Sequence, residues 1–285
     1  MFKLVAIDMD GTLLTSSHEI SERNKEAIKG ALEKGVKIVL CSGRTINNLL
    51  EFTRGLGLIG EEEYVVGHNG AAAMRIIDEE YVYENSLTGK EAKEIAKVCD
   101  SVDANYTIYT FHEAMTPRDN AHGRYEAELN SMNLKVCHPR VLDDEEKITK
   151  VLILDDEEVL DSYIGEIRKH FDDQYNLVRS MPVYLEIMRK EVNKMSGIMA
   201  VAKLHGIEES EIMAIGDAPN DLEMIEGAGL GVAMGNAHDI IKEASDFITR
   251  TNDEDGVAYV LNRYLHLGMD EKDTKQHEPE DIASA

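Results

Sequence analysis

Positively charged residues are scarce in this chain. There are 30 lysines and arginines against 55 aspartates and glutamates, so the formal net charge is −25 at pH 7. Nucleic acids and anionic membranes bind proteins through clustered cations, so the charge argues against both as partners. It also works against long-range attraction of an anionic substrate. An anion therefore has to be captured locally, by a divalent cation, a helix N-terminus or a few basic groups.

Long apolar runs are missing as well. No run approaches the roughly 18 residues that a membrane-spanning helix needs, and no basic region, apolar segment and cleavage site precede the first strand. We therefore expect neither membrane insertion nor secretion. The three cysteines, Cys41, Cys99 and Cys137, form no CxxC pair. An odd number at wide spacing is typical of a reducing compartment, which predicts a cytoplasmic protein with buried, unreactive thiols.

The order of apolar segments indicates an α/β protein. A length of 285 residues suits one or two domains. Strands alternate with helices at both ends of the chain, which predicts a parallel sheet with right-handed crossovers. The strands expected there are 4–7, 36–42, 64–67, 212–217, 230–234 and 246–249.

The middle of the chain follows a different pattern. A hairpin is expected around 78–80, and residues 88–190 mix helices, strands and a polar, irregular stretch at 116–124. This pattern predicts an α+β module inserted into the α/β domain. The expected boundaries are 1–84 for the first part of the core, 85–188 for the insertion, 189–269 for the second part of the core, and 270–285 for an acidic, frayed tail.

The opening segment LVAIDMDGT, residues 4–12, ends a buried strand with two aspartates. Asp8 and Asp10 stand directly before a Gly-Thr turn. Strand ends in open α/β sheets are where ligands bind. Two carboxylates at such an end repel each other, and folding tolerates this repulsion poorly unless a cation or a chemical task holds them there. The alternative is a surface Asp-x-Asp-Gly turn.

A second segment, MAIGDAPND at 213–221, repeats this arrangement. Asp217 follows an apolar strand, and Asp221 follows on the first turn of a helix that Pro219 opens. If the two strands are neighbours, the four aspartates converge, and oxygen-only ligands favour Mg²⁺ over zinc. The alternative is a glycine-containing turn with a capping aspartate.

Phosphate ligands are predicted at two further places. Ser42 ends a strand and stands just before a helix. Its hydroxyl and the backbone N–H groups that follow, starting at Gly43, can donate hydrogen bonds to an anion, which the helix dipole also favours. Lys194 precedes another helix and could neutralise carboxylate and phosphate oxygens together. The alternatives are an ordinary serine N-cap and a solvated lysine. Arg44 and Asn69 are further candidates, for which turn or capping roles are equally consistent.

These segments together resemble the haloacid dehalogenase-like superfamily. Its four ordered motifs match Asp8-Met9-Asp10-Gly11-Thr12, Ser42-Gly43-Arg44, Asn193-Lys194 and Gly216-Asp217-x-x-Asn220-Asp221. The insertion is similar to the type C2 cap. Asn69-Gly70-Ala71 and GVAMGNA (231–237) resemble the Cof-type subfamily IIB of bacterial sugar-phosphate phosphatases. The likeness covers about residues 1–266 and implies a Rossmann-like, doubly wound core with an inserted cap.

The resemblance also implies a role for each matched residue. Asp8 would be the nucleophile, and Asp10 would protonate the leaving alcohol and then activate water. Ser42, Gly43 and Lys194 would bind the phosphoryl group. Mg²⁺ would be held by Asp8, Asp217 and the backbone carbonyl of Asp10. Supporting roles fall to Thr12, Arg44, Asn69, Asn220 and Asp221.

One departure from the family and the cap complete the sequence-based expectations. Met195 stands where the family usually has glycine after the motif lysine, so the entrance could be tighter or the helix start shifted. In the insertion, Arg118, His122, Arg124 and Glu186 are candidates for contacting the substrate. The alternative for the first three is a solvated loop.

The expected function is hydrolysis of a small phosphorylated metabolite, with sugar phosphates as the favoured class. Alternatives are a phosphomutase-type phosphotransferase and a non-hydrolytic regulatory protein phosphorylated on Asp8. A fragment of a transport ATPase is excluded by the missing membrane helices. The substrate is expected to be the main partner, and the protein a monomer or homodimer.

Overall fold

The computed structural model describes residues 1–130 and 132–269, so the predicted tail at 270–285 lies outside the described residues. None of the helices in those two ranges is long and apolar enough to cross a membrane. The chain divides into two compact units. Among the described residues, the first contains 1–43, 49–83 and 193–269, and the second contains 44–48, 84–130 and 132–192.

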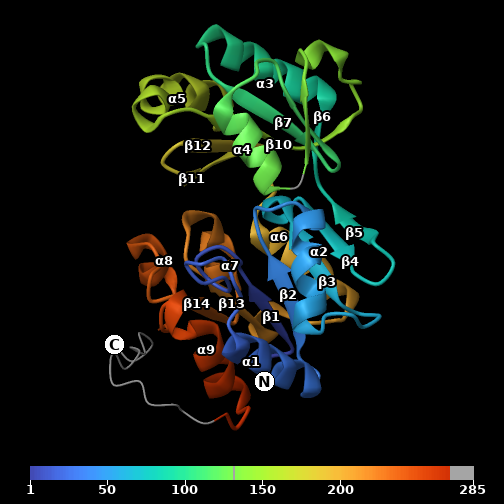
Figure 1. Ribbon diagram of the computed structural model, residues 1–285, viewed down its shortest axis with the longest axis vertical. Helices are drawn as coiled ribbons and strands as arrows, with labels where there is room; N and C mark the ends of the chain where they lie inside the picture. The colour runs from blue at the N-terminus through green and yellow to red at the C-terminus, as the bar shows by residue number, and fades with distance from the viewer. Residues whose placement is uncertain (131, 270–285) are drawn as a thin grey trace. The chain divides into compact units, whose positions relative to one another are not determined.

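The first unit is built on one eight-stranded sheet (Figure 1). Its order is β15-β14-β13-β1-β2-β3-β4-β5, and the pairs from β15 to β3 are parallel whereas β3 and β4 are antiparallel. The strands are β1 (Leu4–Ile7), β2 (Lys37–Cys41), β3 (Tyr64–Gly67), β4 (Ala72–Arg75), β5 (Glu80–Glu84), β13 (Ile212–Gly216), β14 (Leu230–Ala233) and β15 (Phe247–Ile248). This is the α/β doubly wound architecture that the strand and helix pattern predicts.

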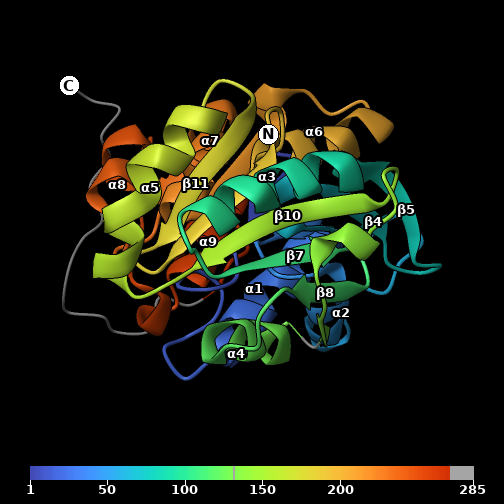
Figure 2. The same ribbon diagram turned by 90° about the horizontal axis from the view of Figure 1, so that it is seen from above.

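Helices cover both faces of this sheet (Figure 2). One face carries α1 and α9, which pack on each other, and the other carries α6, α7 and α8. The bounds are α1 (Glu22–Glu33), α2 (Ile46–Thr53), α6 (Lys194–Leu204), α7 (Leu222–Gly227), α8 (Asp239–Ala244) and α9 (Gly256–Leu265). Ser21 begins α1 because its side chain accepts a hydrogen bond from the Asn24 N–H, which satisfies one free helix donor.

The register of β1 determines where the site forms. Leu4–Ile7 pair in parallel with 212–215 on one side and 37–40 on the other, and all four residues are buried. The expectation that the first strand and the strand before Asp217 are neighbours is therefore confirmed. Strand β2, which follows β1 in the chain, lies on one side of β1, and β13, from the second half of the chain, lies on the other. Such a switch in strand order opens a crevice at the carboxyl ends of the strands.

The second unit has a separate sheet in the order β11-β12-β10-β7-β8-β9, with β6 paired to β10. The strands are β6 (Leu87–Thr88), β7 (Tyr106–Thr110), β8 (Glu113–Thr116), β9 (Asn133–Val136), β10 (Lys147–Leu154), β11 (Tyr175–Met181) and β12 (Tyr184–Arg189). Helices α3 (Gly89–Ser101) and α5 (Glu157–Phe171) pack on one face and enclose the apolar core (Figure 2). A smaller apolar cluster joins the other face to α4 (Ala121–Leu129).

Helix α4 corrects the expectation of an irregular stretch at 116–124. Thr116 belongs to β8, and the helix begins after Asn120, whose side chain accepts a hydrogen bond from the Gly123 N–H. The segment has little apolar periodicity of its own. Packing of Ala127 against the sheet supplies the burial that local sequence does not reveal.

Candidate active site

The two aspartates of the first motif have different surroundings. Asp8 is buried, and its N–H donates to the Ile215 carbonyl of the neighbouring strand at 3.0 Å. Beyond it the chain turns sharply, with the Leu13 N–H donating to the Asp8 carbonyl at 3.2 Å. Asp10 lies in that turn and is exposed. The two-residue spacing therefore yields one enclosed carboxylate and one that solvent or a ligand can reach.

The second motif brings two more carboxylates to the same place. Asp217 accepts a hydrogen bond from the Thr12 hydroxyl at 2.8 Å, so it is linked to the first motif. Asp221 is fully buried and accepts from the N–H groups of Asp217 and Ala218 at 2.9 and 3.0 Å. Carboxylate oxygens of Asp8, Asp217 and Asp221 all lie within 4.8 Å of one another.

Lys194 lies between two of these carboxylates. Its Nζ donates to Asp8 Oδ1 at 2.6 Å and to Asp221 Oδ1 at 2.5 Å, and the side chain is buried. Lys194 is the first residue of α6, which Asn193 caps by accepting from the Ser196 N–H. Met195 is the second residue of this helix, and its side chain lies against Gly227, where a β-carbon would come within 3.1 Å of Met195 Cγ.

The crowding of charge changes the protonation of these groups. Burial, reinforced by the charge of Asp221, raises the pKa of Asp8 well above its ordinary value and that of Asp217 to about 6. Burial lowers the pKa of Lys194, but the carboxylates of Asp221 and Asp8 outweigh it and hold that pKa above its usual range. A buried set of oxygen donors with this excess of negative charge fits a hard divalent cation such as Mg²⁺.

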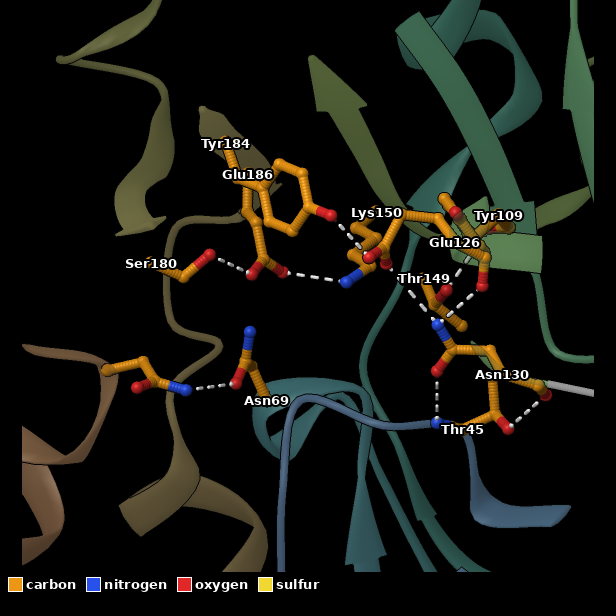
Figure 3. A network of polar contacts seen from close by, with 11 residues as sticks. Thr45, Asn69, Tyr109, Glu126, Asn130, Thr149, Lys150, Ser180, Tyr184 and Glu186 are labelled. Atoms are coloured by element: carbon orange, nitrogen blue, oxygen red, sulfur yellow. Dashed lines mark hydrogen bonds and ion pairs between the residues drawn. The ribbon is translucent and has the colours of Figure 1, made fainter. Parts of the chain in front are cut away.

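The Ser42 segment lies beside a further pair of predicted residues. Ser42 is buried, and its carbonyl accepts from the Asn69 N–H at 3.0 Å. Asn220 Nδ2 donates to Asn69 Oδ1 at 3.0 Å, a bond drawn in Figure 3. Two groups of predicted residues are thus assembled, one around Lys194 and one around Asn69.

The predicted residues of the second unit have partners within that unit. Arg44 donates to Asn48 Oδ1 at 2.7 Å, and Arg118 pairs with Asp103 at 2.6 Å. His122 lies 3.6 Å from a carboxylate oxygen of Asp156. Arg124, on α4, pairs with Asp119.

Glu186 differs from these residues because it is buried. It accepts from Lys150 Nζ at 2.9 Å and from the Ser180 hydroxyl at 2.6 Å (Figure 3). The three side chains come from β10, β11 and β12.

Sequence reasoning assigned no role to one contributor to the site, although the GVAMGNA segment that contains it carried part of the family resemblance. Asn236, which follows β14, donates from Nδ2 to the Gly11 carbonyl at 2.8 Å, and the His238 N–H donates to the Asp217 carbonyl at 2.9 Å. The segment 234–238 therefore steadies both aspartate turns. The available signal was the position of this polar segment directly after a third buried strand that ends at the same edge of the sheet.

Comparison with known proteins identifies the family of the chain. A family model described as haloacid dehalogenase-like hydrolase matches residues 5–261. The chain belongs to this family of hydrolases.

Relatives and solved structures narrow the class. The protein named "Putative phosphatase YxeH" from Bacillus subtilis (strain 168) is 39% identical over 270 residues, covering 93% of this chain and 99% of its own length. The 5-amino-6-(5-phospho-D-ribitylamino)uracil phosphatase YwtE of the same organism is 32% identical over 92% of this chain and 98% of its own. The subclass IIB sugar phosphatase BT4131 superposes with a TM-score of 0.77 at 26% identity, over 93% of this chain and 99% of that one. The protein is accordingly a phosphatase of the haloacid dehalogenase-like family.

Proposed function

We propose that the protein is a Mg²⁺-dependent phosphatase of small sugar phosphates that works through an aspartyl-phosphate on Asp8. The observation that carries this proposal is the buried Asp8 carboxylate, held by Lys194 at the carboxyl end of β1 next to Asp217. Two similar proteins act, by their names, on a phosphorylated ribityl compound and on sugar phosphates. Both names support a polyhydroxylated substrate that carries a phosphate group.

The first chemical step forms a bond from a carboxylate oxygen of Asp8 to phosphorus and breaks the bond from phosphorus to the leaving oxygen. Lys194 offsets the charge of the nucleophile and of the phosphoryl oxygens, while the Ser42 hydroxyl and the Gly43 N–H bind the phosphoryl group. Asp10, which is exposed and two residues away, donates a proton to the departing alcohol.

The second step hydrolyses the aspartyl-phosphate. Asp10, now ionised, takes a proton from water as the water oxygen attacks phosphorus, and the bond to Asp8 breaks to give inorganic phosphate and the free carboxylate. Bound Mg²⁺ would be held by Asp8, Asp217 and the backbone carbonyl of Asp10, and would screen Asp8 from the phosphate dianion. Asp221 keeps Lys194 and the Asp217 loop in place.

The cap contacts and the cellular setting stay predictions. Arg118, His122 and Glu186 are proposed to recognise the part of the substrate that leaves with the alcohol. Among them, Glu186 has the support of being held in one orientation by two hydrogen bonds. The proposed location is the cytoplasm, and the proposed assembly is a monomer or homodimer.

The test is hydrolysis of p-nitrophenyl phosphate by the full chain, with Mg²⁺ and with a chelator, beside Asp8→Asn. We expect phosphate release that needs Mg²⁺, needs no activator sugar, and vanishes in the variant. A requirement for a sugar bisphosphate would favour the phosphomutase alternative. A phosphoenzyme that survives for minutes without turnover would favour the regulatory alternative. Undiminished hydrolysis by Asp8→Asn contradicts the proposal. If the wild-type protein is active, a screen of phosphorylated metabolites identifies its substrate.

A further inference from the structure

The turn that follows β3 has an unusual backbone. His68, Asn69 and Gly70 have φ angles of +53°, +54° and +92°, and all three residues are buried. Non-glycine residues rarely adopt left-handed conformations, although asparagine tolerates them best. Consecutive strained residues persist where their surroundings hold them, and such places are concentrated at functional sites. The contacts of this turn therefore show what the strain maintains.

Asn69 contacts the Ser42–Gly43 peptide from two directions. Its N–H donates to the Ser42 carbonyl at 3.0 Å. Its carboxamide lies against the α-carbon of Gly43, where a β-carbon would come within 3.0 Å of Asn69 Oδ1 and 3.3 Å of Nδ2. Glycine at 43 leaves room for that carboxamide, and the two contacts together set the orientation of the peptide plane.

The same carboxamide reaches the second aspartate loop. Asn69 Oδ1 accepts from Asn220 Nδ2 at 3.0 Å. Asn220 directly precedes Asp221, whose carboxylate binds Lys194 and two N–H groups of its own loop. One side chain thus connects the Ser42 segment with the loop that holds the lysine.

The neighbouring Gly70 contacts the third segment of the site. A β-carbon on Gly70 would lie 1.9 Å from the Asn193 carbonyl oxygen and 3.0 Å from the Lys194 α-carbon. Only glycine allows this approach at a φ of +92°. The turn at 68–70 therefore touches the segments of Ser42, Lys194 and Asn220, which lie far apart in the sequence.

From these contacts we infer that Asn69 is a positioning residue for phosphoryl transfer: its carboxamide aligns the Gly43 N–H with Lys194 through Asn220. The inference rests on the proposed function and adds a residue that acts without touching the reacting atoms. Small displacements of groups that bind a transferring phosphoryl are costly, since a shift of about 1 Å can lower the rate about 100-fold. Metal ligation is carried by other residues, so it is unaffected.

The test compares Asn69→Gly, Asn220→Ala and the double variant in hydrolysis of p-nitrophenyl phosphate. Glycine keeps the left-handed backbone and removes only the carboxamide. We expect kcat/KM to fall about 10–100-fold in Asn69→Gly and at least about fivefold in Asn220→Ala. Because Asn69 and Asn220 act through the one hydrogen bond between them, kcat/KM of the double variant should be within about twofold of that of the less active single variant. The matched control is Glu79→Gly, an exposed left-handed residue (φ +55°) in the turn between β4 and β5, which should stay within twofold of the wild type.

Two binding measurements separate positioning from a general loss of structure. In Asn69→Gly the inhibition constant for inorganic phosphate should rise about tenfold, while the Mg²⁺ concentration for half-maximal activity stays within twofold. Should the glycine variant fail to fold, the isosteric Asn69→Asp replaces it. Its carboxylate beside Gly43 should raise the phosphate inhibition constant at least tenfold.

The inference is overturned by wild-type kcat/KM in either single variant, by losses that multiply in the double variant, or by unchanged phosphate inhibition in Asn69→Asp. Failure of the proposed function looks different, because the unmodified protein would then be inactive or Asp8→Asn would remain active.

Discussion

Two buried clusters of charge, one in each unit, differ in how their charges are balanced. In the first unit, Asp8, Asp217 and Asp221 gather around Lys194, and burial raises the pKa of Asp8 and Asp217. In the second unit, Glu186 is matched by Lys150, with Ser180 as a further donor. The opposite charges of Lys150 and Glu186 compensate each other, whereas the repulsion among the crowded aspartates destabilises the fold until a cation binds them. The gathering of three carboxylates around one point therefore indicates the site that binds a ligand.

The largest expected effect is on catalysis in the first unit. Asp10→Asn removes the proton donor but leaves the amide able to occupy the same exposed position. We expect kcat to fall about 10²–10⁴-fold, since that is the usual contribution of a general acid or base. Steady-state kinetics with p-nitrophenyl phosphate measures the loss, and circular dichroism checks the fold. Wild-type turnover would remove Asp10 from the mechanism.

Removing one partner of the matched pair should destabilise the second unit. Glu186→Gln leaves the Lys150 ammonium buried without its carboxylate, and breaking such a pair costs about 3–5 kcal/mol. Urea denaturation measures the free energy of unfolding of the variant and of the wild type. Lys150→Met combined with Glu186→Leu is the matched control, and it should recover most of the loss because no charge is left buried. A Glu186→Gln variant as stable as the wild type would mean that the pair contributes no structural support.

Removing a carboxylate from the crowded aspartates of the first unit should instead raise the free energy of unfolding. Asp217→Asn removes a charge that burial disfavours, while its side-chain oxygen can still accept from Thr12. We expect the chelator-treated variant to be more stable than the wild type by about 1–3 kcal/mol at pH 7. It should also lose both hydrolysis and stabilisation by Mg²⁺. A less stable variant would show that Asp217 has a structural role instead.

The smallest expected effect is a pH dependence of the metal-free protein. The pKa of Asp217 is about 6 in the folded chain and near 3.8 in ordinary surroundings, so between these values the folded state holds a proton that the unfolded state has released. The contribution of this group to stability is then present at low pH and is lost as the pH rises toward 6.

Because Mg²⁺ favours the ionised carboxylate, its stabilising effect should grow from pH 5 to pH 7.5. Thermal melting with Mg²⁺ and with a chelator at both pH values measures this change. Equal shifts in melting temperature at the two pH values would contradict the assignment of Asp217 as a metal ligand.

Much of the architecture could be anticipated because local patterns are strong where strands are buried. Leu4–Ile7 is apolar throughout and is followed directly by Asp8, and 212–215 repeats the pattern before Asp217, so both strands and their ends could be located. Helix α4 could not, since its few apolar contacts are made with a sheet assembled from distant segments. The role of Asn236 was not predicted, because its partner is a backbone carbonyl, that of Gly11, and no side-chain pattern in the sequence indicates such a bond.

The order of residues alone determined which groups are available: aspartates after buried strands, a serine before a helix, and a lysine after an asparagine cap. It did not determine which of them meet. The parallel register of β1 with β13 places Asp8 near Asp217 and Asp221, and the start of α6 inserts Lys194 between two carboxylates. Only tertiary packing could also bring the left-handed Asn69 against Gly43 and Asn220, because hydrogen bonds reach about 3 Å whatever the separation along the chain.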